Sequence, residues 1–175
     1  VMDDFGGVQG LAIPNGCIVD HNWIHDMNAA KSIGNGLFFG TGAAGVIMKN
    51  NLVHDISHDA LKMDHGVNIT LHNNILAYAN YMMTWTRYVA DTFTFHIDNN
   101  IFDSQRVYVM TGPWANEESK YYINKNIYWH QNDTSKLTWV YKTFDKWQEL
   151  GNDLNSYVTD PLFVDSSKRN FNFKS

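Results

Sequence analysis

The sequence predicts an all-β chain that winds into a parallel β-helix of about five to six coils. Three observations lead to this prediction: a short motif centred on Asn recurs, apolar and polar residues alternate just before each copy, and an apolar pair follows it. The 175 residues include 20 Asn but only 3 Pro and 1 Cys. A chain of this length forms one packed domain, which we expect to span residues 1–175.

The Asn-centred motif occurs five times. The steps between its central Asn residues are 29, 23, 26 and 26 residues. A period in the twenties that tolerates small insertions is typical of a solenoid. The central residues are Asn22, Asn51, Asn74, Asn100 and Asn126.

The residues around each central Asn indicate which solenoid forms. Positions five and three before it are apolar, as in Cys17 and Val19, and the position two before it is polar, as in Asp20. This period of two is typical of a strand. The apolar pair after it, such as Trp23-Ile24, predicts a second inward-facing strand beyond a corner. A leucine-rich repeat is the competing solenoid, but Leu is sparse and the helical segment of such repeats is missing.

We expect each central Asn to occupy the corner itself. Asn tolerates the left-handed conformation that such a corner needs, and its amide can both donate and accept hydrogen bonds. The five Asn residues should therefore form a ladder, one coil (about 4.8 Å) apart. The expected coils lie near residues 1–26, 27–55, 56–78, 79–104 and 105–130, with a final coil at 151–175.

Two segments depart from the repeat. The glycine-rich run 34–45 suits tight turns of a solenoid; it is not a phosphate loop, because no Lys-Ser/Thr follows. Residues 143–150 predict a short lateral helix, in which Thr143 caps the start and Gly151 ends it.

The composition argues against two classes of partner. The formal net charge is −5 and Lys and Arg do not cluster, so we expect neither nucleic acid nor an anionic membrane as partner. No stretch approaches the roughly 18 to 20 apolar residues that a membrane span requires. Cys17 has no second Cys for an internal disulfide. The chain opens without an initiator Met, which indicates a segment of a longer protein.

A family resemblance rests on particular motifs. Residues 22–26 and 51–55 read Asn-x-Ile/Val-His-Asp, and the chain ends with Asp160-Pro-Leu-Phe-Val-Asp165 followed by Asn-Phe-Asn-Phe at 170–173. These motifs resemble the right-handed parallel β-helix proteins of the pectate-lyase-like superfamily, in particular secreted bacterial β-helix glycoside hydrolases. The resemblance implies a right-handed β-helix, the carboxy-terminal portion of a longer carbohydrate-active protein, a polysaccharide or oligosaccharide partner, and an extracellular or periplasmic location.

Candidate catalytic residues gather in one segment. Residues 54–65 hold seven ionisable groups in twelve positions. Within this segment Leu61 and Met63 alternate with Lys62 and Asp64, so inward-facing Leu61 and Met63 would place Lys62 and Asp64 together on the outer face. This face is the candidate groove for an extended polymer.

Hydrolysis of a glycan needs an acid and a second carboxylate as nucleophile or base. We expect Asp59 and Asp64 to be these carboxylates, with His58, Lys62 and His65 around them. Lys62 beside Asp64 would keep that carboxylate ionised.

Two other functions remain open. In a polysaccharide lyase, Lys62, His65 or Arg87 would take the proton alpha to a uronate carboxylate, which Arg87 or a calcium ion would neutralise. Otherwise no cofactor is expected. A non-catalytic glycan-binding or structural β-helix is the third reading. Alignment forward from the Asn positions puts Arg87 one coil above Asp64, whereas backward alignment puts Ala90 there.

Exposed aromatic residues at a groove stack on sugar rings. The substrate-binding candidates are Arg87, Trp85, Tyr88 and Trp114.

The pairs His25-Asp26 and His54-Asp55 occupy identical repeat positions and should stack in adjacent coils. The favoured interpretation is structural: Asp caps the turn and orients His. A metal site at these four groups is the less favoured alternative, and no resident metal is expected.

Overall fold

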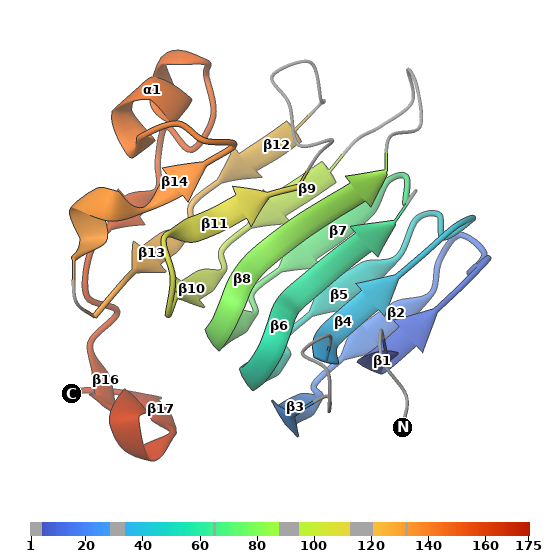
Figure 1. Cartoon of the computed structure of the whole chain (residues 1–175), viewed down its shortest axis with the longest axis horizontal. Helices are drawn as coiled ribbons and strands as arrows, with labels where there is room; N and C mark the ends of the chain where they lie inside the picture. The colour runs from blue at the N-terminus through green and yellow to red at the C-terminus, as the bar shows by residue number, and fades with distance from the viewer. Residues whose placement is uncertain (1–4, 29–33, 65, 88–94, 113–120, 132) are drawn as a thin grey trace.

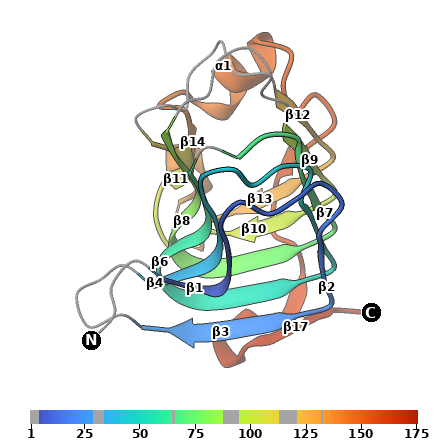
Figure 2. The same cartoon turned by 90° about the vertical axis from the view of Figure 1, so that its right-hand side faces the viewer.

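The computed structural model describes residues 5–28, 34–64, 66–87, 95–112, 121–131 and 133–175. It shows a parallel β-solenoid of about five turns, which confirms the predicted all-β parallel β-helix (Figure 1). Figure 2 shows strands of successive coils one above another, from blue at the bottom to orange further up. None of the helices in the described ranges has both the length and the apolar character needed to cross a bilayer.

The strands on the amino-terminal side of the Asn corners form a five-stranded parallel sheet, as predicted. Val19, Met48 and Leu71 occupy equivalent positions on three neighbouring strands and are buried in the core. The strands are β2 (Ile18–Asp20), β5 (Ile47–Lys49), β7 (Ile69–His72), β9 (Phe95–Asp98) and β12 (Tyr121–Asn124).

The strands beyond the corners form a second, larger sheet that bends around two sides of the solenoid. The long strands β6 (Leu52–Asp64) and β8 (Ile75–Arg87) are paired along most of their length. The first half of β6 also pairs with β3 (Trp23–Met27) and its second half with β4 (Gly34–Phe39). In the same way, β8 pairs first with β10 (Ile101–Asp103) and then with β11 (Tyr108–Thr111). Left-handed residues at Asp55 and Tyr78 mark the bend.

The other members of this sheet are β1 (Phe5–Gly10), β3 (Trp23–Met27), β4 (Gly34–Phe39), β10 (Ile101–Asp103), β11 (Tyr108–Thr111), β13 (Ile127–Trp129), β14 (Thr138–Trp139) and β15 (Tyr157–Val158). The glycine-rich run thus divides into strand β4 and a turn in which Gly42 and Gly45 have positive φ.

The Asn ladder is confirmed. Each Nδ2 donates to the Oδ1 of the Asn in the next coil, over 2.9, 2.9, 3.0 and 3.2 Å from Asn22 to Asn126. The same oxygens also accept the backbone N–H of the preceding ladder residue. Because these amides are satisfied where they are buried, the ladder fixes the register between coils.

The prediction that the ladder Asn itself is left-handed is wrong. The left-handed residue comes one position earlier in every coil. Its positive φ turns the chain so that the following amide points inward, where it meets the ladder. Three of the five left-handed residues are also Asn, which tolerates this conformation well. They are His21, Asn50, Asn73, Asn99 and Lys125, with φ of 53–57°.

Lys125 is exposed and left-handed, a conformation that costs most residues more than it costs Asn. We expect Lys125→Asn to raise the free energy of unfolding by about 0.5–1 kcal/mol, measured by urea denaturation. Lys125→Ala is the control, because it removes the same side chain but does not lower the energy of the left-handed backbone conformation. If it stabilised the protein equally, backbone strain would not be the cause.

The lateral helix is confirmed as α1 (Phe144–Glu149), and Thr143 caps it by accepting the Lys146 N–H over 3.4 Å. Beyond it, the buried Asp153 closes the ladder, since its carboxylate accepts bonds from Asn126 Nδ2 (3.3 Å) and Trp147 Nε1 (2.8 Å). Burial raises the pKa of Asp153, an effect that these hydrogen bonds oppose.

The end of the chain leaves the solenoid after β15, so the expected final coil holds only to Val158. Strands β16 (Phe163–Asp165) and β17 (Asn170–Phe173) form an antiparallel hairpin around the short 3₁₀ helix η2 (Ser166–Lys168). We refer to residues 163–173 as the C-terminal hairpin. It is not one of the stacked coils and is seen at the lower left of Figure 1.

The C-terminal hairpin packs on the outer face of the first halves of β6 and β8. Phe163 and Phe171 form a buried cluster with Tyr78 and Ile101. Arg169 reaches back to coil two, where Nε and Nη2 each donate to Asp55 over 2.5 Å. The hairpin therefore links residues more than a hundred positions apart in sequence.

Candidate functional site

The predicted alternation of inward and outward residues is present on the second half of β6. Leu61 and Met63 are buried in the core, and Lys62 and Asp64 are half-buried on the opposite side, as the alternation predicted. Lys62 Nζ lies 4.9 Å from the centroid of the Phe38 ring, on neighbouring strand β4.

His58 and Asp59 form a hydrogen-bonded pair at the edge of this face. Asp59 is 0% exposed, with Oδ2 lying 2.9 Å from His58 Nδ1 and Oδ1 accepting the Thr84 hydroxyl over 2.5 Å. The His58 side chain is 32% exposed. When Nδ1 carries the hydrogen and donates to Asp59, Nε2 is the ring nitrogen that can meet a ligand. The accessible group is therefore His58, and Asp59 orients it.

Asp64 lies opposite Arg87 in the register of β6 and β8. The forward alignment is thus confirmed over the one that placed Ala90 there. The side chain of Arg87 lies outside the described part of the structure.

The expectation that Trp85 lies outside the inward positions is wrong. Trp85 is 1% exposed, pairs in register with Met63, and packs edge-on against Phe95 with ring centroids 5.0 Å apart. Its position on the strand turns the ring into the solenoid core, where the large side chain fills space between coils. Three other predicted residues, His65, Tyr88 and Trp114, fall outside the described residues.

Other aromatic rings lie beside His58. The Tyr81 ring lies 5.1 Å from His58 and stacks on Tyr108 at 5.7 Å. Sequence analysis did not identify Tyr108. The contact between Tyr108 and Tyr81 depends on the register between β8 and β11. The local sequence pattern does not reveal that register, because the coils differ in length.

The His-Asp corners stack as predicted. The His25 and His54 rings lie 5.3 Å apart and nearly parallel, and each Nδ1 bonds the following Asp over 2.7 or 2.6 Å. Burial opposes ionisation of Asp55, but hydrogen bonds from Arg169 and His54 outweigh it and lower the pKa of this carboxyl. Among the described residues, no three His, Cys, Asp or Glu side chains are grouped as metal ligands would be.

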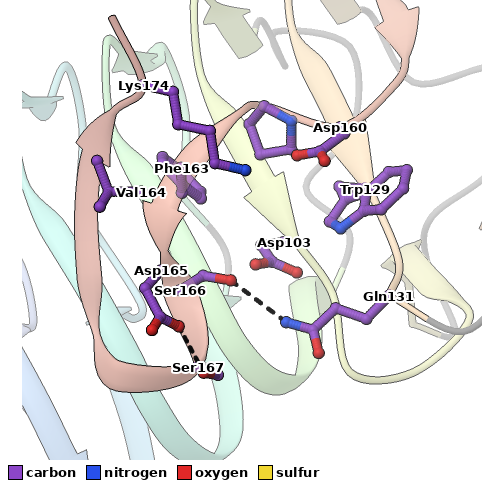
Figure 3. Close-up of a pocket in the computed structure, with 11 residues that line it drawn as sticks. Asp103, Trp129, Gln131, Asp160, Phe163, Val164, Asp165, Ser166, Ser167 and Lys174 are labelled. Atoms are coloured by element: carbon purple, nitrogen blue, oxygen red, sulfur yellow. Dashed lines mark hydrogen bonds between the residues drawn. The ribbon is translucent and has the colours of Figure 1, made fainter.

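A separate cavity that the sequence did not reveal lies between the C-terminal hairpin and strands β10 and β13 (Figure 3). Asp103 lines it, at the register position that Ala77 and His54 occupy in earlier coils. The sequence does place Asp103 directly after the apolar pair Ile101-Phe102, and this carboxylate was the signal that could have identified the site. The cavity itself depends on the hairpin, whose docking the repeat does not predict.

Comparison with protein-family models, with curated proteins and with solved structures found no match.

Proposed function

We propose that the protein is a glycoside hydrolase that cleaves a plant or algal polysaccharide on the outer face of β6 and β8. The observation that carries this proposal is the buried Asp59 oriented toward a partly exposed His58, on the strand that also presents Asp64. Glycan hydrolysis needs a proton donor and a second group that activates water or attacks the sugar.

In this proposal His58 exchanges a proton through Nε2 with the glycosidic oxygen. Asp59 is a positioning residue, because it is fully buried and acts through His58. Asp64 lies six residues beyond His58 on the same extended strand, about 20 Å away, so it binds the polymer beside the cleaved bond and does not act on that bond. The neighbouring Tyr81 and Tyr108 offer aromatic rings against which a sugar can pack.

A polysaccharide lyase is the second candidate, and the register of Asp64 with Arg87 favours it. Lys62 lies on the same strand as Asp64. Cationic residues on neighbouring strands suit a uronate carboxylate, whose charge must be neutralised before the alpha proton is removed.

Product analysis distinguishes these functions. The protein is incubated with neutral and with uronate-containing polysaccharides. New reducing ends without the ultraviolet absorbance of an unsaturated uronate indicate hydrolysis, whereas reducing ends with that absorbance indicate elimination. Retarded migration in glycan-containing gels without any product would instead show a binding module and contradict the proposal.

We expect His58→Ala to lower kcat by about 100-fold or more, because it removes the group that transfers the proton. Asp64→Asn should mainly raise KM, because Asp64 binds the polymer beside the cleaved bond. Asp59→Asn should lower kcat with little change in KM, because it disturbs the orientation of His58. The matched control is Asp145→Asn on α1, away from this face. Full activity of His58→Ala would refute the site.

A further inference from the structure

The cavity under the C-terminal hairpin has a volume of about 300 Å³ and shares no residue with the proposed catalytic face. Strands β10 and β13 form one wall, and the C-terminal hairpin with the segment before it forms the other. Its polar lining includes Asp103, Gln131, Asp160 and Ser166, with the Trp129 ring beside them and Lys174 on the hairpin side (Figure 3).

Asp103 is the notable group in this cavity. It is 1% exposed, and neither carboxylate oxygen has a well-formed hydrogen bond to any residue that the structure describes. The nearby Gln131 amide is directed instead to the hydroxyls of Tyr78 and Ser166. A buried carboxylate without donors is costly, so a ligand or solvent that supplies donors is favoured there.

The charges around Asp103 are predominantly negative. Asp160 lies on the cavity wall, held in place by its Oδ1, which accepts the Leu162 N–H over 2.8 Å. Burial and the charge of Asp160 raise the pKa of Asp103 to about 6, although Gln131 and Arg169 oppose this in part.

The nearby cations are largely committed elsewhere. Arg169 pairs with Asp55, and Lys168 pairs over 3.0 Å with Asp165, the third carboxylate of the lining. Lys174 lines the cavity on the hairpin side, and its side chain extends into it (Figure 3). The lining therefore contains three aspartates and one lysine, an excess of acidic groups.

We propose that this cavity binds the ammonium group of a ligand between Asp103 and Asp160, beside the ring of Trp129. An ammonium group supplies both the missing positive charge and several N–H donors, and the aromatic ring favours a cation at its face. The shared chemistry is a primary amine, as in an amino sugar or a Lys side chain. This inference does not depend on the proposed hydrolase activity.

Calorimetric titration of the whole chain tests this proposal. The probes are methyl glucosaminide, Nα-acetyl-lysine amide, neutral methyl glucoside and calcium chloride. At about pH 7 we expect at least one amine to bind, and the neutral glucoside to bind at least tenfold more weakly. At about pH 5 Asp103 is mostly protonated, and the affinity for the amine should fall several-fold. The two amines distinguish a sugar source from a peptide source.

Variants make the test specific to the cavity. Asp103→Asn should weaken amine binding at least tenfold, whereas Asp145→Asn should leave it unchanged. Lys174→Gln should strengthen it, because a neighbouring positive charge is removed. Circular dichroism checks that each variant is folded, and Asp160→Asn replaces Asp103→Asn if the latter fails to fold.

Four outcomes would overturn the proposal: undiminished binding to the folded Asp103→Asn variant, equal binding of the neutral glucoside, binding of calcium alone, or no binding of either amine. None of them bears on whether the face at His58 cleaves a glycan, so this proposal and the proposed function can fail separately.

Discussion

Asn74→Ala is expected to lower the free energy of unfolding by about 3–5 kcal/mol. Asn74 Oδ1 accepts both the N–H and the Nδ2 of Asn51, each over 2.9 Å. Its own Nδ2 donates to Met48 O and to Asn100 Oδ1, each over 3.0 Å. The substitution leaves these partners unsatisfied in a buried place, where water does not readily replace the amide.

Urea denaturation measures this loss through the midpoint of the transition at constant slope. The matched control is Asn172→Ala, because Asn172 is an exposed amide in β17 outside the ladder. We expect a change of less than about 0.5 kcal/mol there. If Asn74→Ala were as mild as the control, the ladder would not be a main source of stability.

Asp103→Asn is expected to stabilise the protein at neutral pH, by up to about 3 kcal/mol. The pKa of this carboxyl is raised from 3.8 to about 6 in the folded protein. The folded state therefore holds the proton more tightly than the unfolded state, and stability decreases as pH rises from about 4 to about 6. Above that range the full penalty of the buried charge remains, and the neutral Asn does not carry it.

The stability of both proteins is measured by urea denaturation between about pH 4 and about pH 8. The advantage of Asp103→Asn should be small near pH 4, grow through pH 6, and then level off. Asp145→Asn, on the exposed helix α1, should show no such dependence. An advantage that is the same at every pH would indicate a packing effect and contradict the role of the buried charge.

Features that depend on the repeat were predictable from sequence. The ladder Asn residues, the flanking strands and the outward placement of Lys62 and Asp64 all follow from a local period of two, because neighbouring coils repeat the same geometry. Forward alignment placed Arg87 opposite Asp64, but only the strand register decided between it and the backward alignment, which placed Ala90 there. The lateral helix was recognisable because its capping residue Thr143 is local.

Features that depend on contacts between distant segments were not predictable. Trp85 lies inward because of the register of β6 and β8 after an irregular bend. The left-handed residue before each Asn was misassigned, since a corner can place the strained residue at either position and only the ladder decides between them. The partners of Asp59 come from residues 58 and 84, in two different coils.

The sequence by itself thus determined the coil, its Asn ladder and the segment in which ionisable groups gather, because these are properties of a short repeat. Only the tertiary structure decided that Asp59 is buried behind His58 and that the C-terminal hairpin encloses Asp103. The physical reason is that these contacts join residues far apart in sequence. The hairpin is held by apolar contacts of Phe163 and Phe171 and by the ion pair between Arg169 and Asp55, which are 114 positions apart. No local pattern specifies such a contact.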